Sequence, residues 1–134
     1  MKKIKVLLSL ALCLVLLTAC GGGDVRNVKR IPGVSQLYSD GEINAAMKEV
    51  IHFFRREFDG CTMTEIRYDE GKYAERQSAE SEDYGRDVII LLTDFDVDSS
   101  GGDGSLNPDS TYRNYQWTLT RTLFGWKLQD WGYG

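Results

Sequence analysis

Oxygen-bearing side chains between residues 96 and 103 have the spacing of a calcium-binding loop. Three of them recur at every second position and Gly101 follows, which matches the first six positions of an EF-hand loop. Position 12 of such a loop is a bidentate Glu, but Asn107 stands there and no second helix follows. Two interpretations stay open: a hairpin loop shaped by Asp and Gly turns, or a calcium site formed by Asp96, Asp98, Ser100 and Asp103. The sequence predicts no cofactor apart from the calcium of this second interpretation.

Cys20 has the setting of a lipidation site. A basic start (Lys2, Lys3, Lys5) precedes an apolar stretch over 6–17, and Leu17-Thr18-Ala19-Cys20 is followed by glycines. This is the layout of a bacterial lipoprotein signal, in which the cysteine becomes the first mature residue and carries diacylglycerol. A transmembrane span needs about 20 apolar residues, and this run is shorter. We expect residues 1–19 to be a signal peptide and the lipid on Cys20 to hold the protein at the extracytoplasmic face of the cell membrane.

The net charge of the chain limits the classes of partner that the sequence predicts. Removing residues 1–19 leaves 115 residues, enough for one domain. It also takes away three lysines, so that 13 basic residues remain against 20 acidic ones, a net charge near −7. Nucleic acids attract basic proteins, and anionic lipid headgroups attract basic segments. The sequence therefore predicts no nucleic-acid partner, and a membrane contact that depends on the lipid.

Cys61 is the one cysteine left unpaired and unmodified in this scheme. Cys13 leaves with the signal and Cys20 is acylated, so no internal disulfide can form. A nucleophilic role needs an activating environment, and the only histidine, His52, lies nine residues upstream on a predicted helix. The helical count places His52 far from the apolar stripe, facing solvent. We expect Cys61 to be a small, shielded, reduced side chain.

The best-defined element is a helix over 39–59. Ser39 and Glu42 form the S-x-x-E pattern of a capping box, and Gly60 follows the last periodic residue. Apolar residues behind the cap recur at helical spacing, which predicts one face turned to a core. They are Ile43, Met47, Val50, Ile51, Phe54 and Phe58.

The remaining segments indicate a sheet. Residues 62–68 alternate, 87–97 begin as a continuous apolar run, and 114–120 alternate with aromatic residues on the inner face. In the final strand, Trp126 and Leu128 alternate with Lys127, Gln129 and Trp131. Residues 69–84 are highly charged and predict a marginal surface helix or an ordered loop, and 98–110 predict a loop. The predicted core adds Ile66, Phe95, Tyr115, Trp117 and Leu119 to the helix stripe.

These elements predict an α+β domain over 37–134. One main N-terminal helix would pack on a curved antiparallel sheet of about four strands, since an amphipathic helix cannot bury its stripe alone. Residues 20–36 contain glycines and a proline without apolar periodicity. They predict a flexible tether between the membrane and the domain.

Three segments also resemble a known family. Leu37-Tyr38-Ser39 precedes the helix, Phe58-Asp59-Gly60-Cys61 closes it, and DFDVDSSGGDGSLNPDSTY leads into a Trp-bearing strand. They are similar to a domain family of unknown function in lipoproteins of Gram-positive bacteria. The resemblance covers residues 37–133 and implies a cystatin-like or nuclear-transport-factor-2-like cone. No activity is attached to it, so it assigns no functional residue.

Such a cone often encloses an apolar cavity between helix and sheet, and enzymes of this fold place a carboxylate or tyrosine in it. Asp94 or Tyr68 would then be the base or proton donor. The competing interpretation is an ordinary filled core, because a fold does not imply a function. The predicted inner face contains Phe54, Tyr68, Phe95, Tyr115 and Trp117.

The sequence favours a non-catalytic accessory module that binds another envelope protein or peptide through its sheet or its 98–110 loop. A small-ligand or calcium-binding lipoprotein is the second hypothesis. An enzyme that uses the cavity of the cone is the third.

Overall fold

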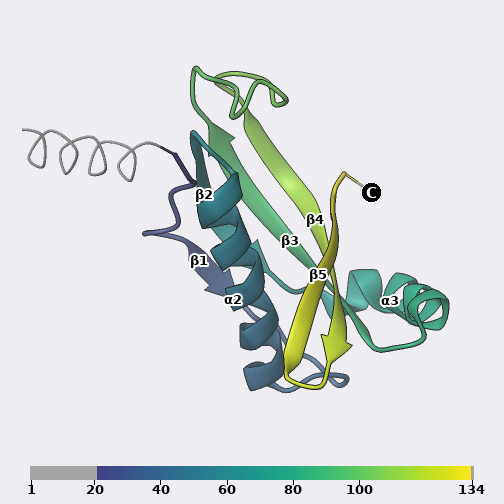
Figure 1. The fold of residues 1–134 in the computed structure, drawn as a ribbon. Helices are drawn as coiled ribbons and strands as arrows, with labels where there is room; N and C mark the ends of the chain where they lie inside the picture. The colour runs from purple at the N-terminus through teal and green to yellow at the C-terminus, as the bar shows by residue number, and fades with distance from the viewer. Residues whose placement is uncertain (1–20, 134) are drawn as a thin grey trace, which may run out of the picture.

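The computed structural model describes residues 21–133. The predicted signal peptide and Cys20 therefore lie outside the described residues. The chain forms an α+β structure of two helices packed on one five-stranded sheet (Figure 1). The elements in chain order are β1 (Lys29–Ile31), α2 (Asp40–Glu57), β2 (Cys61–Arg67), α3 (Glu70–Tyr84), β3 (Val88–Val97), β4 (Thr111–Thr122) and β5 (Gly125–Gly132).

The sheet differs from the expected four antiparallel strands. The strand order is β1-β2-β3-β4-β5, and β1 pairs in parallel with β2 while the other pairs are antiparallel. The sheet is mixed and not strongly curled, which corrects the predicted curved cone. β1 escaped prediction because its three residues, Lys-Arg-Ile, are too few to show an alternating pattern.

Helix α2 confirms the sequence prediction in detail. The Ser39 hydroxyl accepts a hydrogen bond from the backbone N–H of Glu42, and the Glu42 carboxylate accepts one from the Ser39 backbone N–H, both 3.2 Å. The predicted stripe is buried except for Phe58, which caps the helix and is partly buried. His52 is exposed, as predicted. Burial of this stripe against β2, β3, β4 and β5 forms the main core.

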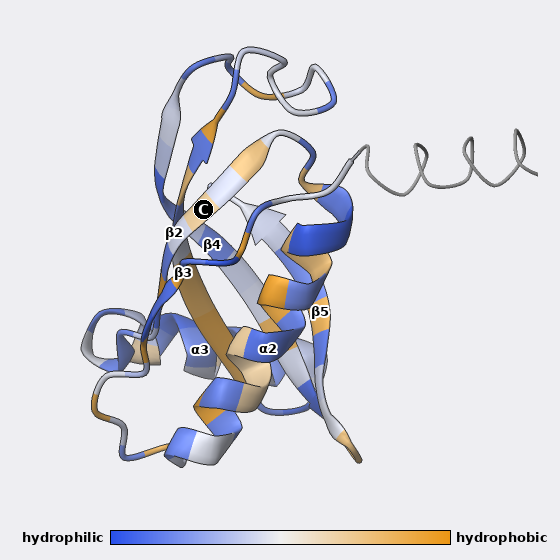
Figure 2. Cartoon of the chain, turned by 90° about the vertical axis from the view of Figure 1, so that its left-hand side faces the viewer, coloured by the Kyte–Doolittle hydropathy of each residue, from blue (hydrophilic) through white to orange (hydrophobic). Residues whose placement is uncertain are grey.

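Strand β3 is apolar on both faces because a helix covers each of them. Its odd-numbered residues join the core beneath α2, whereas Val88, Ile90 and Leu92 pack with Tyr73 of α3. Figure 2 shows this hydrophobic strand between the two helices. The charged segment 69–84 therefore forms a helix, α3, which packs on the sheet through a small apolar contact at Tyr73. Buried Gln77 strengthens this contact, since its side-chain oxygen accepts a hydrogen bond from the Ile90 N–H at 2.9 Å.

The described part of the predicted tether is packed against the domain. The Gly23 N–H donates to the Arg55 carbonyl at 3.0 Å, and the Asp24 N–H donates to the Cys61 carbonyl at 2.8 Å. A Cβ on Gly23 would lie 2.7 Å from the ring and the carbonyl oxygen of Phe54. Glycine is required here because the chain passes directly against the end of α2. Where the sequence predicts a flexible tether over 20–36, the structure holds residues 23 and 24 against the domain and pairs β1 with β2.

Candidate functional site

A hollow of about 250 Å³ lies where the C-terminal end of α2 meets the 98–110 loop, the first half of β4 and the end of β5. Helix α2 contributes Phe53, Glu57 and its C-cap residue Phe58. Gly102, Ser105 and Leu106 of the loop close one side. The loop holds this position because the Asp98 N–H donates to the Gly60 carbonyl at 2.9 Å. The loop is thus fixed to the turn that follows α2.

The walls of the hollow are aromatic. Phe53 and Phe58 come from α2, Tyr115 from β4 and Trp131 from β5. The ring centres of Phe53 and Trp131 are 4.6 Å apart, and those of Phe58 and Tyr115 are 6.1 Å apart. Trp131 is 42% exposed and the other three rings are partly buried. The hollow is therefore open to solvent and offers ring surface to an entering group.

The rim of the hollow is acidic. Glu57, Asp59 and Asp103 line it together with the aromatic rings, and none of the lysines and arginines among residues 21–133 does. Arg55 and Arg56 lie in the same turn of α2 but are exposed and outside the lining. None of the ion pairs among residues 21–133 includes any of the three carboxylates. The rim therefore carries three negative charges without a cation beside them in the lining.

The negative charges around the hollow also affect the pKa of the buried Cys61 thiol. Burial, with a smaller contribution from the charges of Asp98, Asp59 and Asp103, raises the pKa of Cys61 to about 11. The side chain is 2% exposed and unbridged, so the expectation of a shielded, reduced cysteine is confirmed. A thiol with this pKa stays protonated near neutral pH, which excludes an activated nucleophile.

The four predicted calcium ligands are not gathered around one point. Asp96 accepts a hydrogen bond from the Thr111 hydroxyl at 2.7 Å. Asp98 accepts from the N–H of Ser100 at 2.9 Å, and Asp103 from the N–H of Ser105 at 3.0 Å. Among the described residues, no group of three or more His, Cys, Asp or Glu side chains is placed to hold a metal ion. The geometry supports the interpretation of Asp and Ser as turn-forming residues.

The two residues considered as a catalytic base have their polar atoms engaged. Asp94 pairs with Arg67 at 3.1 Å and accepts from the Asn114 N–H at 2.9 Å. The Tyr68 hydroxyl donates to Glu70 at 2.9 Å and accepts from Gln77 at 3.1 Å. Burial raises the pKa of Tyr68 to about 12. Core side chains pack between α2 and the sheet, and neither Asp94 nor Tyr68 lines the hollow.

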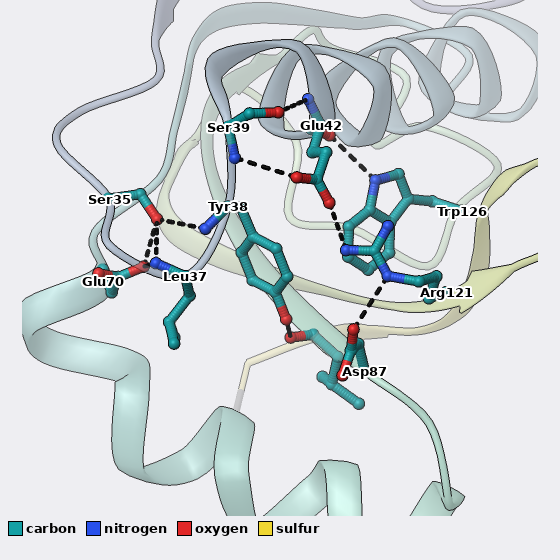
Figure 3. A network of polar contacts seen from close by, with 10 residues as sticks. Ser35, Leu37, Tyr38, Ser39, Glu42, Glu70, Asp87, Arg121 and Trp126 are labelled. Atoms are coloured by element: carbon teal, nitrogen blue, oxygen red, sulfur yellow. Dashed lines mark hydrogen bonds and ion pairs between the residues drawn. The ribbon is translucent and has the colours of Figure 1, made fainter.

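A polar network fastens the opposite end of α2 (Figure 3). The Arg121 guanidinium pairs with Glu42 and, at 3.0 Å, with Asp87. It also lies over two aromatic rings, 4.6 Å from the ring centre of Trp126 and 5.7 Å from that of Tyr38. This network joins the first turn of α2 to the β4–β5 hairpin and to the start of β3.

Comparison with known proteins gives no match: no family model, no curated protein and no solved structure is similar to this chain. Among the described residues, no helix has the length and apolar character needed to cross a membrane. The case for a function therefore depends on the geometry of the hollow and on the sequence ahead of residue 21.

Sequence reasoning locates the loop of this site but misses most of its walls. It predicts the 98–110 loop as an interaction segment, whereas it assigns Phe58 and Tyr115 to a closed core. It gives Phe53, Glu57 and Trp131 no functional role. The unusual length of the 98–110 loop is a sequence signal for a functional segment. The walls show no such signal, because tertiary packing alone brings together residues 53–59, 102–106, 115 and 131.

Proposed function

We propose that this protein is a lipid-anchored binding module at the extracytoplasmic face of the cell membrane. It binds another envelope protein or peptide through the aromatic, acidic hollow at the end of α2. The observation that carries this proposal is the hollow itself, in which four aromatic rings and three carboxylates are accessible together. Rings that are accessible beside polar groups are typical of binding sites.

The ordered start of the domain supports a position of the hollow close to the bilayer. Gly22 donates a backbone hydrogen bond to Asp59, which lines the hollow. One residue spans about 3.8 Å, so a lipid on Cys20 attaches within a few residues of the site. The anchor then holds the hollow near the membrane surface, with no long flexible linker between the lipid and the site.

The same geometry favours binding over catalysis. No histidine or cysteine of residues 21–133 lines the hollow, and its acidic residues lie at the rim with access to water. General acid–base chemistry depends on a group with a tuned pKa that touches the reacting atoms. The resemblance to the Gram-positive lipoprotein family stays a prediction, and nothing in this proposal depends on it.

The anchor is tested by Cys20→Ala in the full chain. We expect the variant to leave the membrane fraction or to retain its signal peptide, because the lipid is the expected anchor. Cys61→Ala is the matched control and should fractionate like the parent. Detergent-dependent membrane association of Cys20→Ala equal to that of the parent would refute the lipid anchor.

The binding role is tested by photocrosslinking in cells. A photoreactive side chain replaces Ser105, an exposed residue of the hollow, or Ser78, an exposed residue of α3. We expect a discrete adduct from position 105 that disappears when Trp131→Ala is added, and none from position 78. Equal adducts from both positions, or none from 105, would overturn the binding role.

A further inference from the structure

The two ends of α2 carry the same combination of groups. At the N-terminal end, the rings of Tyr38 and Trp126 and the carboxylates of Glu42 and Asp87 surround the Arg121 guanidinium. A cation gains from a ring face and from opposite charges at once. At this end of α2, an arginine of the chain itself, Arg121, therefore supplies the cation that the rings and carboxylates bind.

At the C-terminal end, rings and carboxylates line a hollow whose lining includes no basic residue from the part of the chain that the structure describes. We propose that this hollow binds a basic side chain, arginine or lysine, from an extracytoplasmic peptide or protein. The inference rests on the proposed binding function and names the chemistry of the partner. The cation would lie where Glu57, Asp59 and Asp103 meet the rings, with its aliphatic stem against Trp131 and Phe53.

The size of the hollow suits one side chain. Its volume of about 250 Å³ is below the range of about 300–1,000 Å³ typical of sites for drug-sized ligands. The opening at Trp131 leaves room for the chain that carries the side chain. A protein or peptide partner fits this opening because only its side chain has to enter. The acidic mature domain, with a net charge near −7, also attracts basic partners over a distance.

The test uses the full chain in nonionic detergent and a pair of capped five-residue peptides. One peptide has a central arginine among glycines, and its twin has citrulline, which keeps the shape and removes the charge. We expect saturable binding of the arginine peptide, followed by Trp fluorescence, and at least tenfold weaker binding of the citrulline peptide. The lysine peptide should bind within a few-fold of the arginine peptide.

Two double variants with the same change in net charge provide the control. Glu57→Gln with Asp103→Asn removes charge from the rim, while the new amide oxygen can still accept the hydrogen bond from Ser105. Glu82→Gln with Asp83→Asn removes the same charge from exposed positions of α3. We expect the first pair to weaken binding about fivefold and the second to change it less than twofold.

Three results would overturn the inference: equal binding of the arginine and citrulline peptides, equal effects of the two double variants, or binding to phosphatidylethanolamine vesicles without binding to the peptides. The two proposals can fail separately. A crosslinked adduct from position 105 together with no preference for arginine would leave the binding role standing and refute the basic side chain. The absence of any adduct from position 105 in the otherwise unchanged chain would refute the binding role itself.

Discussion

Gly23→Ala distinguishes a packed N-terminal segment from a flexible tether. The new Cβ would lie 2.7 Å from two ring carbons and from the carbonyl oxygen of Phe54, which is fully buried and cannot move aside. Inserting a methyl group into a packed site costs about 1–3 kcal/mol. In a domain of this size, about 4 °C of melting temperature corresponds to 1 kcal/mol. We expect the melting temperature to fall by about 4–12 °C.

The expected local signature of Gly23→Ala is loss of the backbone contacts next to it. The Asp24 N–H donates to Cys61 at 2.8 Å and the Met63 N–H donates to Asp24 at 2.9 Å, so both amides should exchange hydrogen faster. Gly41→Ala is the control, because its Cβ would make only an ordinary 3.9 Å contact with the Ser39 hydroxyl and alanine favours helix. An unchanged melting temperature for Gly23→Ala, with rapid exchange of both amides already in the parent, would restore the flexible tether.

Four further outcomes are expected. Phe54→Ala should cost about 3–5 kcal/mol in a denaturant titration, since this fully buried ring packs on Phe58 and Phe95; a negligible shift would contradict the core. Cys61, followed by mass spectrometry, should react slowly with a thiol reagent at pH 8 and rapidly in denaturant, because burial raises its pKa to about 11; immediate reaction would place it at the surface. Hydrogen bonds from Arg121 and Ser39 hold the pKa of Glu42 below its ordinary value. Its contribution to stability is therefore fully present above the ordinary pKa of a glutamate and is lost as the pH falls through the lowered pKa. Glu42→Gln should therefore reduce the fall in melting temperature on acidification, and an identical pH profile would refute this role. Calcium titrated into the full chain should give no saturable heat, because Asp96, Asp98 and Asp103 accept hydrogen bonds from different partners; saturable binding would revive the calcium site.

Elements with strong local signals could be predicted from the sequence. Helix α2 followed from its capping box and apolar stripe, and β3 from its continuous apolar run, because these patterns depend on near neighbours in the chain. β1 could not be predicted in this way. Its pairing with Glu65–Arg67 is parallel and lies more than 30 residues away, and a three-residue strand shows no period of its own.

The N-terminal glycines show why composition alone misleads. Gly-Gly-Gly is typical of a flexible linker, but glycine is also the residue that permits close backbone approach. Only the partner distinguishes the two uses, and here the partner is the last turn of α2, 32 residues away at Arg55. The hollow could not be predicted for the same reason. Phe58 and Tyr115 have the spacing of core residues, and only tertiary packing brings them beside the exposed Trp131.

The placement of the hollow and its charge support one another. Helix α2 has 18 residues, about 27 Å at 1.5 Å per residue, so its two aromatic and acidic ends are well separated. The N-terminal end of α2, where Arg121 pairs with the carboxylates, is far from Gly21. The C-terminal end, where no basic residue of 21–133 lines the hollow, lies beside the expected lipid attachment. A membrane that carries anionic lipids concentrates basic segments at its surface, within a Debye length of about 8–10 Å. The proposed anchor would thus hold an acidic, aromatic hollow in the layer where basic side chains accumulate, and a short attachment would favour their capture more than a long tether would.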